Sequence, residues 1–260
     1  MSLVEVTRDG HVATLTLNRP ELRNALSVDL CDVIVTALEE IRAAGDARVV
    51  VVTGNGKAFC SGADFAAVSG PGGIDFLPHF ERMLEALARF ELPTIARIHG
   101  AALGGGFQLA CVCDFRIAAY SATIGIPAAR LGIVVNVENV RRLVHLVGIA
   151  RAKSILMTGH IFTGTQAADD DLVQLCVPDE ELDANVAEFA HGLATLSPLS
   201  VQGAKRAIQA VIDTTGDVRG AGLAGELDAL VTEAYNSADL AEGLRAMTEK
   251  RPPEFRGRQP

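Results

Sequence analysis

The sequence IHGAALGGGFQLA, residues 98–110, predicts a buried β-strand that turns through glycines directly into a helix. Residues 95–98 are apolar and follow Pro93, as expected of a buried strand, whereas residues 107–112 contain no glycine or proline and can be helical. Three successive glycines let the backbone adopt angles that a Cβ would forbid. Their N–H groups lie at a helix start, where free donors and the helix dipole favour negative charge. Such a turn can hold a phosphate or the oxyanion that develops on a reacting carbonyl.

A second glycine-containing turn precedes this one in the chain. It is AFCSGADF, residues 58–65, and it also follows an apolar strand, residues 48–53. Two further motifs lie upstream, LNRPE at 17–21 and RNALS at 23–27. Together, F-C-S-G-A-D, H-G-x-A-x-G-G-G and these upstream motifs resemble the crotonase family, the enoyl-CoA hydratases and isomerases. The resemblance extends from about Val4 to Arg258, and the motifs occur in the order that the family has.

The order of apolar strands and amphipathic helices predicts an α/β fold. Strands are expected at 4–6, 12–17, 48–53, 95–98, 114–119 and 123–126, with helices at 27–44 and 74–90. Strand, helix and strand in succession indicate a parallel sheet with right-handed crossovers. Helices then follow at about 137–147, 150–158, 164–169, 180–196, 198–213, 218–236 and 238–249. The resemblance adds the architecture, a crotonase-like spiral of β-β-α units. It implies a core at 1–195 that holds the CoA and acyl site, and a helical region at 196–260 that forms trimers and closes the pocket.

Composition limits the possible partners and cofactors. The chain has 260 residues, 49% of them hydrophobic, and a formal net charge of −9, which argues against nucleic acid and anionic membranes as partners. It has neither an apolar stretch long enough to span a membrane nor the N-terminal pattern of a signal peptide, so we expect a cytoplasmic location. The five cysteines have irregular spacing, and Cys111 and Cys113 lack a second ligand pair, so we expect free thiols and no metal site. Cys60 can be a nucleophile or only a small residue in its turn.

The resemblance assigns the substrate-binding groups. In the family, the thioester carbonyl of the substrate accepts two backbone N–H groups, which correspond here to Ala63 and Gly105. Polarising that carbonyl stabilises an enolate. Relatives bind the CoA nucleotide between the R-N-A-L loop and the F-C-S-G-A-D turn, which implies that Arg23, Ala25 and Ser61 contact it together with Ala63. Coenzyme A is then part of the substrate, and no prosthetic group is expected.

The reactive carboxylates of a typical hydratase are absent from their expected positions. Such an enzyme has one glutamate two residues after G-G-G and another directly after a proline further along the chain. Here these positions are Gln108 and Ala128, and neither side chain can act as a general base. Both line the substrate pocket by analogy, as does Asn136, where some relatives place a catalytic aspartate. We therefore do not expect the hydratase mechanism that uses two glutamates.

Glu138 is the first candidate for a replacement acid. It lies near a helix start, where a carboxylate is favoured and its pKa is lowered. The alternative is that Glu138 simply faces solvent. Glu81 and Glu85 on the 74–90 helix are the next candidates, and their alternative is likewise a solvated charged face. Residues 68–73, which are rich in glycine, are expected to form a mobile loop that borders the acyl pocket.

These observations predict an enzyme that acts on an acyl-CoA thioester through an oxyanion-stabilised enolate. Isomerisation is favoured over hydration, because one carboxylate that moves a proton suffices for it. The alternative is a catalytically inactive protein that binds or carries acyl-CoA in lipid metabolism. In either case the resemblance implies a homotrimer or a dimer of trimers.

Overall fold

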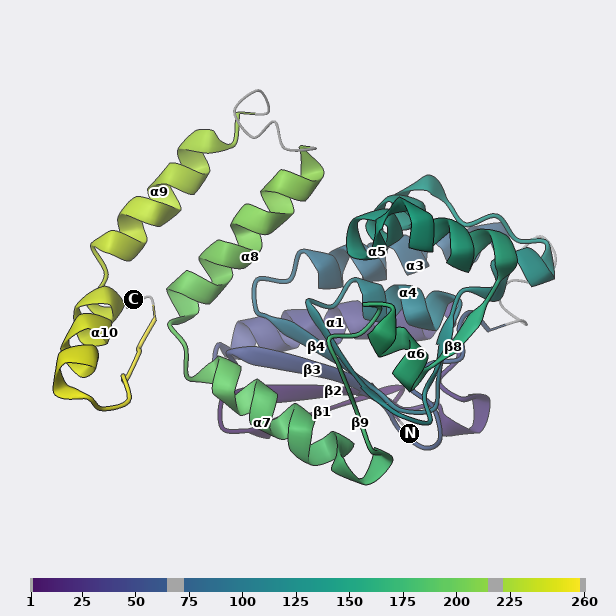
Figure 1. The fold of residues 1–260 in the computed structure, drawn as a ribbon, viewed down its shortest axis with the longest axis horizontal. Helices are drawn as coiled ribbons and strands as arrows, with labels where there is room; N and C mark the ends of the chain where they lie inside the picture. The colour runs from purple at the N-terminus through teal and green to yellow at the C-terminus, as the bar shows by residue number, and fades with distance from the viewer. Residues whose placement is uncertain (1, 65–72, 215–221, 258–260) are drawn as a thin grey trace.

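A six-stranded sheet forms the centre of the molecule, with strand order β1-β2-β3-β4-β6-β9 (Figure 1). The computed structural model describes residues 2–64, 73–214 and 222–257. The strands of this sheet are β1 (Val4–Asp9), β2 (Val12–Leu17), β3 (Val49–Gly54), β4 (Thr94–Ile98), β6 (Phe115–Ala119) and β9 (Leu175–Val177). β1 and β2 pair antiparallel as a hairpin, and every other neighbouring pair is parallel. The predicted α/β class with a parallel sheet is confirmed.

Helices cover both faces of this sheet. The helices are α1 (Val28–Ala44), α3 (Gly73–Ala88), α4 (Gly105–Cys111), α5 (Val137–Thr158), α6 (Gly164–Asp169), α7 (Leu182–Ala194), α8 (Pro198–Asp213), α9 (Ala224–Tyr235) and α10 (Ala238–Glu249). In β3, Val50 and Val52 belong to the core that contains α1 and α3. Val49 and Val51 belong instead to the core that contains α7. Because successive side chains of a strand point to opposite faces, a strand buried on both sides is mainly apolar, as the four consecutive valines of β3 are.

The limits of α1, which match the predicted helix at 27–44, follow from its two caps. The Ser27 side chain accepts the backbone N–H of Leu30, and Gly45 ends the helix in the left-handed conformation with φ of 68°. Between the caps, a stripe of buried residues faces the sheet. It comprises Leu30, Cys31, Ile34, Ala37, Leu38 and Ile41.

The chain changes sheets at Gly100, which corrects one prediction. Gly100 has φ of +55°, and a Cβ there would lie 2.1 Å from the Lys57 carbonyl oxygen. The chain then forms β5 (Ala101–Leu103), which pairs with β7 (Thr123–Gly125) in a second sheet completed by β8 (Ile161–Thr163). The glycines at 104–106 therefore lead into α4 from β5, and not from the predicted strand at 95–98, which belongs to β4. β5 contributes only three residues, too few to give an alternating pattern, and pairing with β7 is what makes it a strand.

The second half of the chain differs from prediction in detail. The predicted helices 137–147 and 150–158 correspond to the two parts of α5, which are separated by non-helical backbone angles at Gly148, where φ is 74° and ψ is 166°. The short strands β8 and β9 were not predicted, and three 3-10 helices, η1 (Pro20–Leu22), η2 (Pro127–Leu131) and η3 (Asp179–Glu181), add to the connections. The expected loop at 68–73 lies outside the described residues except for its last residue.

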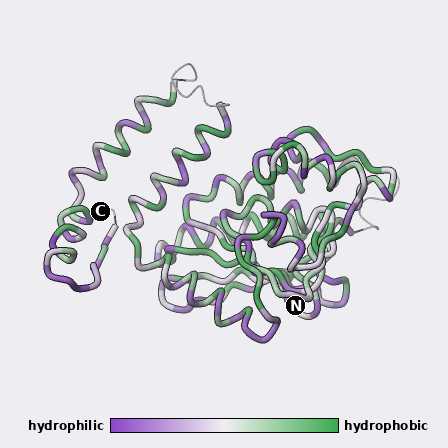
Figure 2. Tube along the Cα trace, viewed as in Figure 1, coloured by the Kyte–Doolittle hydropathy of each residue, from purple (hydrophilic) through white to green (hydrophobic). Residues whose placement is uncertain are grey.

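Helices α8, α9 and α10 project to one side of the core (Figure 1). Apolar and polar residues alternate along α8 and α9 in Figure 2, as in amphipathic helices. Within the described ranges, no helix combines the length and apolar character that a membrane span requires.

Candidate active site

A short segment after β3, residues 60–64, forms one wall of the candidate site, and we call it the strap. Cys60 pairs with β5, since its N–H donates to Ala101 (2.9 Å) and its carbonyl accepts from Leu103 (3.1 Å). On its other edge the strap pairs with Leu26, whose N–H donates to Gly62 (2.8 Å). The strap therefore lies between the loop that precedes α1 and β5.

The strap and the start of α4 each present a backbone N–H. In the parallel bridge between Leu26 and Ala63, Leu26 uses its own N–H and carbonyl, so the N–H of Ala63 points away from Leu26. Gly105 is the first residue of α4, where helix N–H groups have no partner within the helix. Among residues 2–64, 73–214 and 222–257, neither the Ala63 N–H nor the Gly105 N–H donates in the backbone hydrogen bonds found outside regular elements.

These two groups lie close together. A Cβ on Gly62, directly before Ala63, would lie 3.5 Å from the backbone nitrogen of Gly105. A Cβ on Gly105 would lie 3.4 Å from Leu26 and 3.3 Å from the Phe80 ring of α3. Ala63 and Gly105 are therefore both neighbours of Leu26, and the site is built from backbone that only small residues permit.

The strap can approach α4 closely because Gly106 has no side chain where it faces the Cys60 backbone. A Cβ on Gly106 would lie 2.2 Å from the Cys60 carbonyl oxygen, a distance that no real contact has. Cys60 itself is fully buried, and burial raises the pKa of its thiol to about 12. A thiol that stays protonated is a poor nucleophile, so Cys60 fits its turn as a small residue.

The residues predicted to contact CoA lie in the strap or directly beside it. The N–H of Ser61 donates to the Arg23 carbonyl (3.0 Å), and the Ser61 hydroxyl donates to the Leu22 carbonyl (3.3 Å). Arg23 is exposed and has a left-handed backbone, with φ of 51°. Ala25 is buried two residues further on. Arg23 and Ser61 thus form one surface next to Ala63.

The two positions that lack glutamate lie on different elements. Gln108 is three residues after Gly105, so both lie on the same face of α4, and Gln108 is partly exposed. Ala128 lies in η2 and is buried. A carboxylate is absent from both positions, as the sequence states directly.

The start of α5 joins α3 through one carboxylate, and this contact was not predicted. Asn136 caps α5 and donates its amide N–H to Glu81 of α3 (2.7 Å). Asn139 donates to the same oxygen of Glu81 (2.6 Å), and Arg142 donates to the other (3.2 Å). Glu81 directly follows Phe80, whose ring packs at Gly105. The candidate pocket residue Asn136 and the neighbourhood of Gly105 are therefore linked through α3.

Glu138 is held by a different partner. Its carboxylate accepts from Arg141 at 2.6 and 3.1 Å, and its side chain is 41% exposed. The hydrogen bond from Arg141 lowers the pKa of Glu138, with further contributions from Arg142 and Arg89. The predicted direction of the pKa shift is confirmed, although Arg141 is its main cause. Arg141 also donates to the Ile212 carbonyl of α8, so this pair lies on the side of α5 that faces α8.

Arg142 gathers the acidic residues of this region. Its guanidinium is only 12% exposed and contacts Glu81 (3.2 Å), Glu85 (2.7 Å) and Glu138 (3.4 Å). The three candidate carboxylates thus belong to one cluster between α3 and α5. Within the part of the chain that the structure describes, no group of three or more potential ligand side chains could hold a metal ion.

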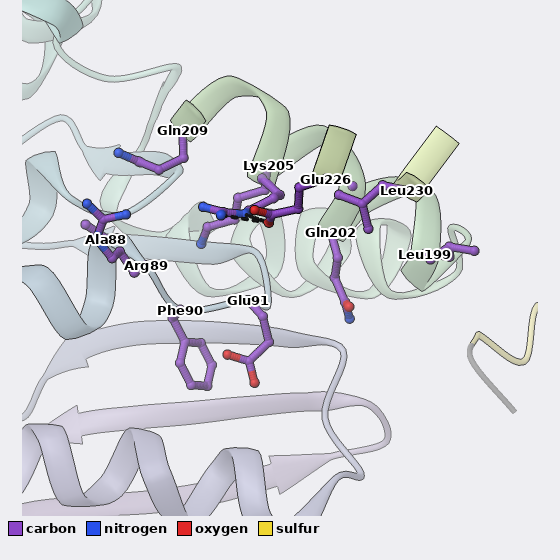
Figure 3. Close-up of a pocket in the computed structure, with 12 residues that line it drawn as sticks. Ala88, Arg89, Phe90, Glu91, Leu199, Gln202, Lys205, Gln209, Glu226 and Leu230 are labelled. Carbon is purple, nitrogen blue, oxygen red and sulfur yellow. Dashed lines mark hydrogen bonds and ion pairs between the residues drawn. The ribbon is translucent and has the colours of Figure 1, made fainter. Parts of the chain in front are cut away.

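A separate cleft of about 430 Å³ lies between the end of α3, α8 and α9 (Figure 3). Its lining includes Ala88, Arg89, Phe90, Glu91, Leu199, Gln202, Lys205, Arg206, Gln209, Glu226 and Leu230. Arg206 is paired with Glu226 (2.7 Å), and Lys205 with Asp114 (2.7 Å). Both cations are thus paired with carboxylates, and the cleft lies at the C-terminal end of α3.

Comparison with known proteins places this geometry in a family. A family model described as enoyl-CoA hydratase/isomerase matches residues 7–258. The chain is 35% identical to a 2,3-dehydroadipyl-CoA hydratase of Escherichia coli, covering 99% of this chain and 100% of that protein. It is 34% identical to an enoyl-CoA isomerase/hydratase of Mycosarcoma maydis, covering 94% and 92%. A crystal structure of an enoyl-CoA hydratase/carnithine racemase from Magnetospirillum magneticum superposes with a TM-score of 0.91 at 32% identity, covering 98% of this chain and 96% of that one. The chain therefore belongs to the enoyl-CoA hydratase/isomerase family.

Proposed function

We propose that this protein binds an acyl-CoA thioester and stabilises its enolate. The observation that carries the proposal is the closeness of two backbone N–H groups, those of Ala63 and Gly105, beside Leu26. Donors fixed by the backbone need no reorganisation when charge develops on the thioester oxygen, and each is typically worth about 3 kcal/mol in the transition state. Arg23, Ser61 and Ala25 lie where the nucleotide end of CoA would contact the same wall.

The reaction that suits these residues is isomerisation of an enoyl-CoA. A 3-enoyl thioester loses its α-proton to a carboxylate, the electron pair enters the enolate, and the resulting carboxylic acid, whose proton exchanges with solvent, protonates the γ-carbon to give the 2-enoyl thioester. One carboxylate serves both steps. Hydration needs in addition a base that activates water, and Gln108 and Ala128 supply none.

The carboxylate comes from the cluster around Arg142. Glu138 is the residue that the sequence names first, and its lowered pKa keeps it ionised and ready to accept a proton. Glu81 is the stronger candidate, because it is bonded to Asn136 and follows Phe80 at Gly105. Glu138 is turned toward Arg141 and α8. We therefore assign proton transfer to Glu81 and keep Glu138 as the alternative.

The test is deuterium exchange with a panel of 2-enoyl, 3-enoyl, dienoyl and aryl CoA esters in D₂O. We expect label at the α- and γ-carbons of at least one ester, with net conversion of the 3-enoyl to the 2-enoyl form. Product masses and label position identify the reaction. Addition of water to a 2-enoyl ester would contradict the isomerase assignment.

A carrier of acyl-CoA is the second candidate function, favoured by the loss of both glutamate positions alongside an intact pair of donors. It predicts tight binding of an ester by calorimetry with no exchange at any carbon. The same panel therefore separates the two functions.

We also propose that copies of the chain associate through the C-terminal helices. These helices expose many apolar side chains, namely Ile208, Val211, Val231, Tyr235, Leu244 and Met247, each at least half exposed. Burying such side chains against another copy removes apolar surface from water. Light scattering after size exclusion is expected to give three or six times the 27.3 kDa mass of the chain. A monomeric mass at micromolar concentration would contradict the proposal.

A further inference from the structure

Arg19 lies beneath the strap and is largely buried. It precedes η1, and its side chain is only 15% exposed. One arm of the guanidinium donates to the Ala25 carbonyl at 2.7 Å. The other arm donates to the carboxylate of Asp64 at 3.1 Å. A single planar group thus joins two segments that lie far apart in the sequence.

The two contacts of Arg19 enclose the bridge that orients Ala63. Ala25 directly precedes Leu26, and Asp64 directly follows Ala63. The N–H of Asp64 also donates to the Leu26 carbonyl (2.9 Å). Rotation of the peptide before Ala63 would break the hydrogen bond from the Leu26 N–H to the Gly62 carbonyl, and Arg19 restrains both sides of this bridge.

Asn24 fixes the position of Arg19 itself. The Asn24 side chain is fully buried and accepts the backbone N–H of Arg19 at 2.9 Å. Its amide N–H groups donate to carbonyls just before the strap, including that of Ala58 at 2.7 Å. The loop that carries Arg19 is therefore attached to the same chain segment that its guanidinium restrains.

The geometry of this contact requires arginine. A guanidinium offers several N–H donors in a rigid plane and can bind a carbonyl and a carboxylate at once. A lysine ammonium is a compact charge on a flexible stem, so it can keep the ion pair but cannot hold both acceptors in fixed directions.

We propose that Arg19 is a positioning residue for the oxyanion site, acting through Asp64 to direct the N–H of Ala63 at the thioester carbonyl. The inference rests on the proposed function, because it assumes that an acyl-CoA carbonyl occupies this site. Arg19 need not touch the substrate.

The test uses the absorbance of a bound aryl-substituted 2-enoyl-CoA ester, which moves to longer wavelength when the thioester carbonyl is polarised. We expect a clear red shift on the unaltered protein. In Arg19→Met the shift is expected to fall to less than half, while the dissociation constant changes less than about tenfold. Arg19→Lys is expected to recover only part of the shift, and Asp64→Asn to resemble Arg19→Met. With a substrate found by exchange, kcat is expected to fall more than KM rises.

Two comparisons make the outcome specific. Arg8→Met removes an arginine that is paired with Asp46 (2.9 Å) on the surface, and it is expected to leave the shift unchanged. The double variant Arg19→Met with Asp64→Asn is expected to show a red shift close to that of Arg19→Met alone, because the loss of Arg19 already breaks its contact with Asp64. Circular dichroism verifies that each variant is folded. If Arg19→Met does not fold, the red shift of Asp64→Asn tests the positioning role.

Failure of the positioning role and failure of the proposed oxyanion site give different results. A full red shift in folded Arg19→Met or Asp64→Asn would overturn the positioning role alone. Absence of any red shift on the unaltered protein, with ester bound, would overturn the proposed oxyanion site and the positioning role with it.

Discussion

Gly106→Ala is expected to lower the free energy of unfolding by about 3 kcal/mol, because the new methyl group has no space. Its Cβ would lie 2.2 Å from the Cys60 carbonyl oxygen and 2.8 Å from the carbonyl carbon, so backbone must move. The movement separates the strap from α4, and with it Ala63 from Gly105. Urea denaturation measures the stability, and the red shift of a bound enoyl-CoA measures the site.

Gly192→Ala is the matched control for that substitution. Gly192 lies inside α7, and a Cβ there meets nothing within 4 Å. Alanine is favoured over glycine in a helix, so this variant is expected to be equally stable or more stable by up to about 1 kcal/mol. A Gly106→Ala protein as stable as the unaltered one would mean that the strap is not held against α4 as described.

Glu81→Gln is expected to slow deuterium exchange into a substrate at least about 100-fold, the usual lower limit for loss of a general base. Glutamine keeps the size of the side chain and an oxygen that can accept from Asn136 and Asn139. It cannot accept a proton from carbon at neutral pH. Substrate affinity, measured by calorimetry, is expected to change little.

Glu138→Gln and Glu85→Gln are the comparisons, because both residues also contact Arg142. Each removes one negative charge from the same cluster without touching Glu81. We expect exchange within a few-fold of the unaltered rate in both. If Glu138→Gln lost exchange and Glu81→Gln kept it, the proton-transfer role would be assigned to Glu138 instead of Glu81.

The sequence predicted the elements whose signals are local. The strand β3 begins with four consecutive valines, and α1 has a serine cap and a terminal glycine, so both were located closely. β5, β8 and β9 have three residues each and exist only because a partner strand lies beside them. Their residues carry no periodic pattern of their own, so sequence reasoning could not find them.

The candidate site was predictable to the extent that motifs carried it. The glycines around Ala63 and Gly105 indicated a site because backbone donors require small neighbours. The contact of Arg19 with Asp64 and that of Asn136 with Glu81 each join residues that are distant in the sequence. From the sequence, each arginine or glutamate has many oppositely charged candidate partners. Which of them it contacts is determined only by the fold. The roles of Ala63, Gly105, Arg23, Ala25, Ser61 and Glu138 stay predictions.

The donors of this site belong to the peptide backbone, and this affects how such a protein can change. A substitution at Gln108, Ala128 or Glu81 replaces a side chain but leaves the N–H groups of Ala63 and Gly105 in place. The part that we propose to polarise the carbonyl is therefore unaffected by substitutions among the proposed acids and bases. Under the proposed function, one scaffold can exchange or lose its acids and bases while it still binds the same class of thioester, so related proteins can evolve toward different reactions.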